Sequence, residues 1–81
     1  MPSDARAAIL NVTAVFPSAT SHLTVWPSGA PRPVASNLNF SPGQVVANLV
    51  IVPLQAGKLS IYNNSGNVNV IADVVGYLPA P

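Results

Sequence analysis

The sequence predicts a small all-β domain: a single-domain β-sandwich or flattened barrel of about six to seven largely antiparallel strands spanning residues 1–81. Nine Pro and five Gly fall mainly between apolar runs, where they stop helices and make turns. The runs are short and rich in Val, Ile, Leu, Thr and aromatic residues. No stretch shows a 3.6-residue apolar period with capping residues, so we expect little or no helix.

Turn residues divide the chain into apolar segments that we expect to be the strands. In chain order these are residues 8–16, 22–26, 34–40, 44–52, 58–63 and 68–77. The first segment ends before Pro17, and the Pro-rich stretch 27–33 separates the second from the third. Pro42 and Gly43 precede the fourth segment, and residues 53–57 separate it from the fifth.

Two segments alternate as half-buried strands do. In the second, Leu23 and Val25 point to one face, and the other face carries His22, Thr24 and Trp26. In the fifth, the two faces are formed by Leu59 with Ile61 and by Ser60 with Tyr62. One face of each strand is therefore expected to meet solvent or a partner.

Three other segments are apolar on both faces. Residues 45–52 and 68–75 are apolar at nearly every position, and residues 8–16 are nearly as apolar. Such a strand needs cover on both sides, whereas a sandwich of this size has a single interior layer. We therefore expect a homo-oligomer, with a trimer or another closed assembly favoured, or packing against another coat or surface protein.

Asparagine is the recurrent polar residue. Asn63-Asn64-Ser65-Gly66 lies between two apolar segments and predicts a hairpin turn, because Asn tolerates positive φ and Gly has no Cβ to clash. Strand patterns disfavour Asn, yet four lie inside expected strands: Asn11, Asn37, Asn39 and Asn48. Their amides either satisfy loop backbone and bulges or line a sugar-binding groove. We favour the first interpretation, because buried amides are usually satisfied structurally.

Charge is scarce, which restricts the possible chemistry. The charged residues make up 6% of the chain, against about a quarter in soluble domains, and are Asp4, Arg6, Arg32, Lys58 and Asp73. Three scattered cations give no footprint for nucleic acid. No apolar run reaches the roughly eighteen residues that a membrane-spanning helix needs. We expect no nucleic-acid partner, no membrane span and no cofactor.

The sequence does not predict a catalytic or metal site. Ser, His and Asp all occur, but His22 is the single histidine, Asp4 lies in an expected tail, and no Gly-x-Ser-x-Gly motif is present. Metal binding needs three or four ligands, and His22, Asp4 and Asp73 are too few and too scattered. We therefore expect the chain not to be an enzyme.

Asp73 lies in the middle of an apolar segment, on the same expected face as Ile71, Val75 and Tyr77. An unpaired carboxylate there is costly. Arg32 is the best candidate partner, because its planar fork binds a carboxylate in a bidentate way. Alternatively, both side chains reach solvent at a sheet edge, or Asp73 binds a ligand. The candidate structural polar network comprises Arg32, Asp73, Asn37, Asn39 and Asn48.

Trp26, His22 and Tyr62 occupy outward positions of the alternating strands and form a candidate interface or ligand surface. An exposed aromatic ring beside amides suits sugar recognition. Alternatively, Trp26, which precedes Pro27, covers the end of the core or anchors a subunit contact, because Trp is enriched in both settings. We rank an interface or core role above a glycan role.

Several motifs together carry a resemblance over nearly the whole chain. They are Leu10-Asn-Val-Thr13, Leu23-Thr-Val-Trp-Pro-Ser-Gly29, Arg32-Pro-Val-Ala-Ser-Asn-Leu-Asn-Phe40, Gly43-Gln-Val-Val-Ala-Asn48, Gly57-Lys-Leu-Ser-Ile-Tyr62 and Val70-Ile-Ala-Asp-Val-Val-Gly-Tyr77. The sequence resembles the cysteine-free branch of the β-sandwich repeat found, often in tandem, in extracellular and cell-wall-associated actinobacterial proteins. The resemblance implies an accessory module without established catalytic residues.

The resemblance also implies a proximity and a setting. Many family members carry a Cys pair where this chain has Ser28 and Ser60, so these two loops are expected to lie close in space. Family members follow a signal peptide or another domain, whereas this sequence begins at Met1 and ends at Pro81, with expected tails at 1–6 and 78–81. We expect a repeat excised from an extracellular or cell-surface protein, or a virion protein of a phage of such bacteria.

The function expected from these observations is that of a non-catalytic structural or interaction module displayed on a surface. Low charge, high apolarity, an all-β fold and the implied oligomer all suit a capsid decoration or tail accessory protein. The alternative is a carbohydrate- or cell-wall-binding accessory domain, with a glycan as the partner.

Overall fold

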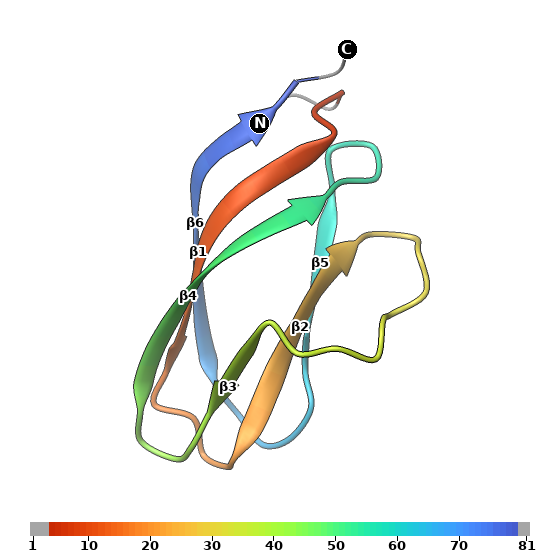
Figure 1. The fold of residues 1–81 in the computed structure, drawn as a ribbon. Coiled ribbons are helices and arrows are strands. Elements are labelled where there is room, and N and C mark those ends of the chain that lie inside the picture. Colours follow the sequence, from red (N-terminus) through yellow and green to blue (C-terminus); the bar gives the residue numbers. More distant parts are fainter. Residues whose placement is uncertain (1–3, 80–81) are drawn as a thin grey trace.

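In the computed structural model, which describes residues 4–79, six strands form two antiparallel three-stranded sheets (Figure 1). The strands are β1 (Ala7–Val15), β2 (Ser21–Pro27), β3 (Leu38–Phe40), β4 (Val45–Pro53), β5 (Leu59–Asn63) and β6 (Asn69–Leu78). The predicted all-β, sandwich-like fold is confirmed. Over residues 4–79 no helix forms, and hence none long and apolar enough to cross a membrane.

The β1 sheet has the strand order β4-β1-β6, and the β2 sheet has the order β3-β2-β5. All four strand pairs are antiparallel. Only β2 and β3 are neighbours both in sequence and in a sheet, so the other connections cross from one layer to the other. The β1 sheet therefore has β4 and β6 as its edges, and the β2 sheet has β3 and β5.

The core lies between the two sheets and follows the period of two that a half-buried strand imposes. In β1, alternate residues are buried, and the small or branched side chains of the inner face are Ala8, Leu10, Val12 and Ala14. Val50 and Val52 of β4 lie on this same inner face. The core residues that face them from the β2 sheet are Leu23, Val25, Leu38 and Phe40. Strand β1, at the centre of its sheet, thus contributes much of one side of the core.

The two sheets are offset, which leaves β6 uncovered. Strands β2 and β3 pack against β4, whereas β6 packs chiefly against β1. Val70 and Val74 of β6 pair with the inner-face residues Ala14 and Leu10, and yet both are exposed. The sandwich is therefore open along β6.

A β-bulge interrupts the pairing of β1 with β6. Leu10 pairs with Val74, but Ile9 pairs with Gly76, so Val75 is an extra residue. Because side chains alternate with a period of two, one extra residue transfers all later positions to the opposite face. Tyr77, opposite Ala8, therefore lies on the inner face, whereas Asp73, opposite Asn11, lies on the outer face. The prediction that Asp73 and Tyr77 share a face is wrong.

Two predicted connections also differ from the structure. The third strand is confined to Leu38–Phe40, because residues 34–37 belong to a loop that leaves the sheet. The predicted hairpin at Asn63–Gly66 is wrong, because β5 and β6 pair with different central strands. The turn is instead an arch between the sheets, in which Gly66 adopts φ +67 and the Ser65 amide donates to Ser21 Oγ at 2.9 Å.

Backbone pairing extends into the expected tails. The Arg6 amide donates to the Leu78 carbonyl at 3.0 Å, and the Leu54 amide donates to the Arg6 carbonyl at 2.9 Å. Ala5 is buried, and Leu78 is the last residue of β6. The tails are therefore shorter than residues 1–6 and 78–81, and their outermost residues, 1–3 and 80–81, lie outside the described residues. The two ends of the described chain lie close together (Figure 1).

Candidate functional site

The outer face of the β2 sheet carries the aromatic residues that the sequence singles out. His22, Thr24 and Trp26 alternate outward along β2, and Thr24 pairs with Tyr62 of β5. The His22 and Tyr62 rings lie 6.5 Å apart between centroids, tilted by 57°. The structure thus brings two of the three predicted surface residues together.

The loop between β2 and β3 folds over this face and is held to it at two points. Thr24 Oγ1 donates to the Ala35 carbonyl at 2.6 Å, and Trp26 Nε1 donates to the Ala30 carbonyl at 3.0 Å. Thr24 is only 1% exposed, although its alternation predicts an outward position. The sequence does not indicate that the loop between β2 and β3 covers Thr24, because this loop is an irregular, Pro-rich segment.

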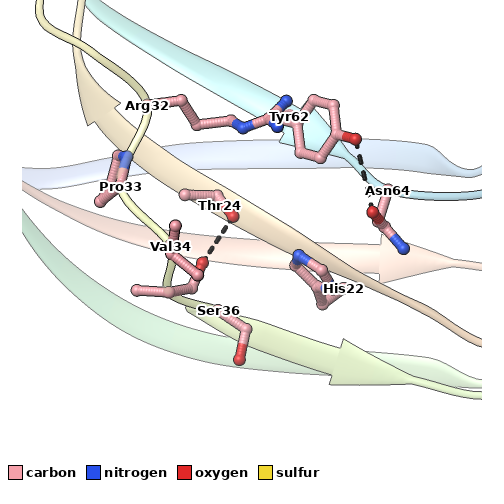
Figure 2. A pocket seen from close by; sticks show the side chains of 9 residues that line it. His22, Thr24, Arg32, Pro33, Val34, Ser36, Tyr62 and Asn64 are labelled. Atoms are coloured by element: carbon pink, nitrogen blue, oxygen red, sulfur yellow. Dashed lines mark hydrogen bonds between the residues drawn. The ribbon is translucent and has the colours of Figure 1, made fainter.

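Between this loop and the strands lies a hollow of about 390 Å³, called the loop hollow below (Figure 2). Its polar and aromatic lining residues are His22, Thr24, Arg32, Ser36, Tyr62 and Asn64, and the loop adds the apolar residues 33–35. The Arg32 guanidinium carbon lies 3.7 Å from the centroid of the Tyr62 ring, in cation–π geometry. The Tyr62 hydroxyl donates to Asn64 Oδ1 at 3.4 Å. The loop hollow therefore combines one cation, two aromatic rings, an amide and hydroxyls.

Trp26, the third predicted surface residue, does not line the loop hollow. Its indole N–H is taken by the Ala30 carbonyl, and its side chain is half-buried. Trp26 anchors the loop rather than offering a free platform for a ligand.

The structure does not bring Arg32 and Asp73 together. Arg32 lies over Tyr62 of the β2 sheet, whereas Asp73 is exposed on the outer face of β6, opposite Asn11. Strand β6 is an edge strand, and the Asp73 carboxylate reaches solvent there. Because the carboxylate stays hydrated, it needs no ion-pair partner. Of the interpretations given for Asp73, the geometry agrees with exposure at a sheet edge.

The strand asparagines differ in their tasks. Asn37 Oδ1 accepts from the Val25 backbone N–H at 2.7 Å, and the Asn37 backbone N–H donates to the Leu23 carbonyl at 2.8 Å. Asn48 of β4 donates to the Asn37 carbonyl at 2.8 Å and so links the two sheets. These groups satisfy backbone hydrogen bonds just before β3 begins. Asn39 and Asn11 face outward, opposite His22 and Leu49.

A second surface is formed by apolar side chains of the β1 sheet, called the β6 surface below. On the outer face, Ile71 is 50% exposed and Ile51 of β4 is 65% exposed. On the inner face of β6, Val74 is 54% exposed, and Tyr77 and Val70 are exposed as well. A single strand thus presents apolar side chains on both of its faces.

The histidine and the mid-strand aspartate lie on different sheets. His22 lies on the outer face of the β2 sheet and Asp73 on that of the β1 sheet. Ser21 Oγ donates to Asn63 Oδ1 at 2.8 Å, so this hydroxyl serves the arch between the sheets. Within residues 4–79, no three His, Asp or Glu side chains gather around a common point that a metal ion would occupy.

Ser28 and Ser60 lie close together, with their hydroxyl oxygens 2.9 Å apart. This proximity was expected from the resemblance and is confirmed. The comparisons with known proteins are silent on the family: no family model matches the chain, and no curated protein or solved structure matches it.

Proposed function

We propose that the chain is a non-catalytic structural or interaction module that assembles with copies of itself. The exposure of β6 on both faces carries the proposal, since Ile71 and Val74 are 50% and 54% exposed. Monomeric soluble proteins rarely expose large contiguous apolar patches, and such patches commonly mark protein contacts. A second copy packed on the β6 surface would remove these side chains from water.

The free edge of β6 favours strand pairing as the mode of assembly. An edge strand presents unpaired N–H and C=O groups, and natural proteins protect such edges with Lys, Pro or bulges. Strand β6 contains neither Lys nor Pro, and only Asp73 and the bulge at Val75 interrupt it. The protection is therefore weak for a strand of 10 residues.

The position of Asp73 favours a ring over a two-fold dimer. Asp73 lies at the middle of β6, so antiparallel pairing of β6 with itself would bring the two carboxylates near the two-fold axis. Like charges across a strand pair are destabilising. Pairing of β6 with the β4 edge of the next copy avoids this contact, and such head-to-tail interfaces form rings when the rotation from copy to copy closes. A trimer is the expected ring.

Light scattering at micromolar concentration tests the proposal. The natural chain is expected to form a closed oligomer, and Val74→Lys is expected to dissociate it, because an ammonium group would be buried at the contact. Val34→Lys is the control, because Val34 lies on the loop and is 107% exposed. Circular dichroism checks that both variants fold. A monomeric natural chain, or an unchanged oligomer for folded Val74→Lys, would contradict the proposal.

The setting we propose is a surface: a decoration or accessory protein of a virion, or an accessory repeat of a cell-surface protein. Low charge and an apolar, all-β chain support both settings. The genomic neighbourhood separates them. Neighbouring capsid genes would favour the virion, and sibling repeats behind a signal peptide would favour the cell surface.

A second candidate function is carbohydrate or cell-wall binding at the loop hollow. It is favoured by aromatic side chains beside amide and hydroxyl groups, namely His22 and Tyr62 with Asn64 and Ser36. Titration with simple sugars and cell-wall fragments, followed through the nuclear magnetic resonance signals of His22 and Tyr62, tests this function. These rings are better reporters than Trp26, because Trp26 does not line the hollow.

A further inference from the structure

Arg32 provides the loop hollow with an uncompensated positive charge. Within residues 4–79, no carboxylate lines the hollow, since neither Asp4 nor Asp73, the two acidic residues of the sequence, is among the lining residues. Within residues 4–79, the Arg32 side chain makes no hydrogen bond or ion pair; its one specific contact is with the Tyr62 ring. Its N–H groups therefore remain available to an anionic ligand.

The Arg32 side chain is also held in place before any ligand arrives. Pro31 and Pro33 flank it and restrict the backbone. The loop is tied to β2 on both sides of Arg32, at Ala30 and at Ala35. The guanidinium carbon lies 3.7 Å from the centroid of the Tyr62 ring, and this contact further restricts the side chain. A preorganised group loses less conformational entropy on binding, so the ligand retains more of the interaction energy.

The stacked guanidinium changes what the hollow can recognise. It covers one face of the Tyr62 ring, so a neutral sugar cannot stack on that face. Ionic hydrogen bonding to Arg32 becomes the strongest interaction on offer, and a guanidinium fork matches a carboxylate in geometry and charge. The Asn64 side-chain NH₂, with its Oδ1 turned toward Tyr62, and the Ser36 hydroxyl provide weaker polar contacts.

We propose that the loop hollow binds a carboxylate-bearing sugar unit of the uronic-acid type, with its carboxylate on Arg32 and its hydroxyls toward Asn64 and Ser36. This inference rests on the second candidate function and names the ligand class for it. The volume of about 390 Å³ falls in the range of small-molecule sites, roughly 300–1,000 Å³. The site is shallow and has one cation, so we expect a Kd of about 1 mM for a single sugar unit.

The test is a nuclear magnetic resonance titration of the isotope-labelled natural chain with four probes: glucuronate, glucose, N-acetylglycine and inorganic phosphate. Saturable shifts at His22, Tyr62 and the Arg32 side chain with glucuronate, at least ten-fold weaker with the other three, would support the proposal. Glucose binding as tightly as glucuronate would overturn it and leave neutral saccharide binding standing. Equal binding of N-acetylglycine or phosphate would overturn the sugar assignment. If no probe shows saturable binding, both the uronic-acid proposal and the carbohydrate-binding function would be overturned.

Two arginine variants separate the site from the overall charge. Arg32→Gln is expected to weaken glucuronate binding at least ten-fold, and Arg32→Lys, which keeps the charge but loses the fork, several-fold. Arg6→Gln makes the same chemical change outside the hollow and is expected to leave the affinity unchanged. Equal weakening by Arg6→Gln and Arg32→Gln would show a response to net charge only and would overturn the proposal.

Discussion

The hydroxyl oxygens of Ser28 and Ser60 lie 2.9 Å apart, where β2 ends beside β5. The Ser28 amide continues the ladder beyond the last residue of β2, because it donates to the Lys58 carbonyl at 3.3 Å. Ser60 itself pairs with Trp26. The two serines are thus diagonal neighbours across two strands, positioned by backbone pairing rather than by their own hydrogen bond.

This proximity predicts an engineered disulfide. The double variant Ser28→Cys, Ser60→Cys is expected to form an internal bridge, because bridging needs Cα atoms within about 7 Å. Closing a loop of this length should raise the free energy of unfolding by about 3–4 kcal/mol in the chain-entropy picture. Free-thiol titration and urea unfolding, with the two single variants as controls, measure both effects. Free thiols that persist under oxidising conditions would refute the expected geometry.

Much of the fold can be predicted from the sequence because it follows from local patterns. Pro and Gly placed the strand ends close to the observed ones, and alternation identified the core face of β2. The partner of each strand was not predictable in this way. The turn at Asn63–Gly66 contains hairpin residues, yet β6 pairs with β1, since sheet membership depends on distant strands.

Asn37, which directly precedes β3, is expected to be important for stability. Asn37→Ala removes the acceptor of the half-buried hydrogen bond that the Val25 backbone N–H donates. We therefore expect the free energy of unfolding to fall by about 1–3 kcal/mol. Asn39→Ala is the matched control, because Asn39 is exposed and makes no side-chain hydrogen bond within residues 4–79. Its expected cost is below about 0.5 kcal/mol. Equal costs in urea unfolding would show that the Asn37 amide has no special task.

Gly66 and Gly43 form a second matched pair. Both have positive φ, but a Cβ at Gly66 would lie 2.7 Å from Ser18 Oγ and 2.9 Å from Ala19 Cβ, whereas a Cβ at Gly43 meets nothing within 4 Å. Gly43→Ala should therefore cost about 1 kcal/mol from backbone strain alone. Gly66→Ala should cost about 1–3 kcal/mol more, because the arch must shift. Thermal unfolding that ranks the two variants equally would contradict this account.

The candidate site was predictable in its residues but not in its arrangement. The outward alternation of β2 and β5 identified His22 and Tyr62. Arg32 was singled out as the candidate ion-pair partner of Asp73, whereas it lies over the Tyr62 ring. Arg32 and Tyr62 are far apart in the sequence, and Arg32 lies in an irregular loop. Neither periodicity nor turn chemistry constrains a side chain in such a loop. The bulge at Val75 reversed the face of Tyr77. Its one sign in the sequence is Gly76, directly after it, because a glycine inside a strand often marks a bulge.

Phe16 combines a strained backbone with an exposed ring. It follows β1 with φ 48, a conformation that costs a non-glycine residue about 1–2 kcal/mol, and its side chain is 68% exposed. Strain of this kind clusters at functional positions. Phe16 also lies beside the start of β6, because Val15 pairs with Asn69. We therefore expect the ring to contact a second copy in the proposed assembly.

The variants Phe16→Gly and Phe16→Ala separate the backbone from the ring. Both remove the ring, but only Gly adopts positive φ without strain, so Phe16→Gly should be more stable than Phe16→Ala by about 0.5–1 kcal/mol once the greater chain entropy of Gly is included. Urea unfolding in the Val74→Lys background measures this difference without the contribution of association. In the otherwise natural chain, both variants should weaken the oligomer equally in light scattering, because both lack the ring. An oligomer unchanged by either variant would show that Phe16 lies outside the contact, and equal stability of the two variants would show that its backbone is not strained.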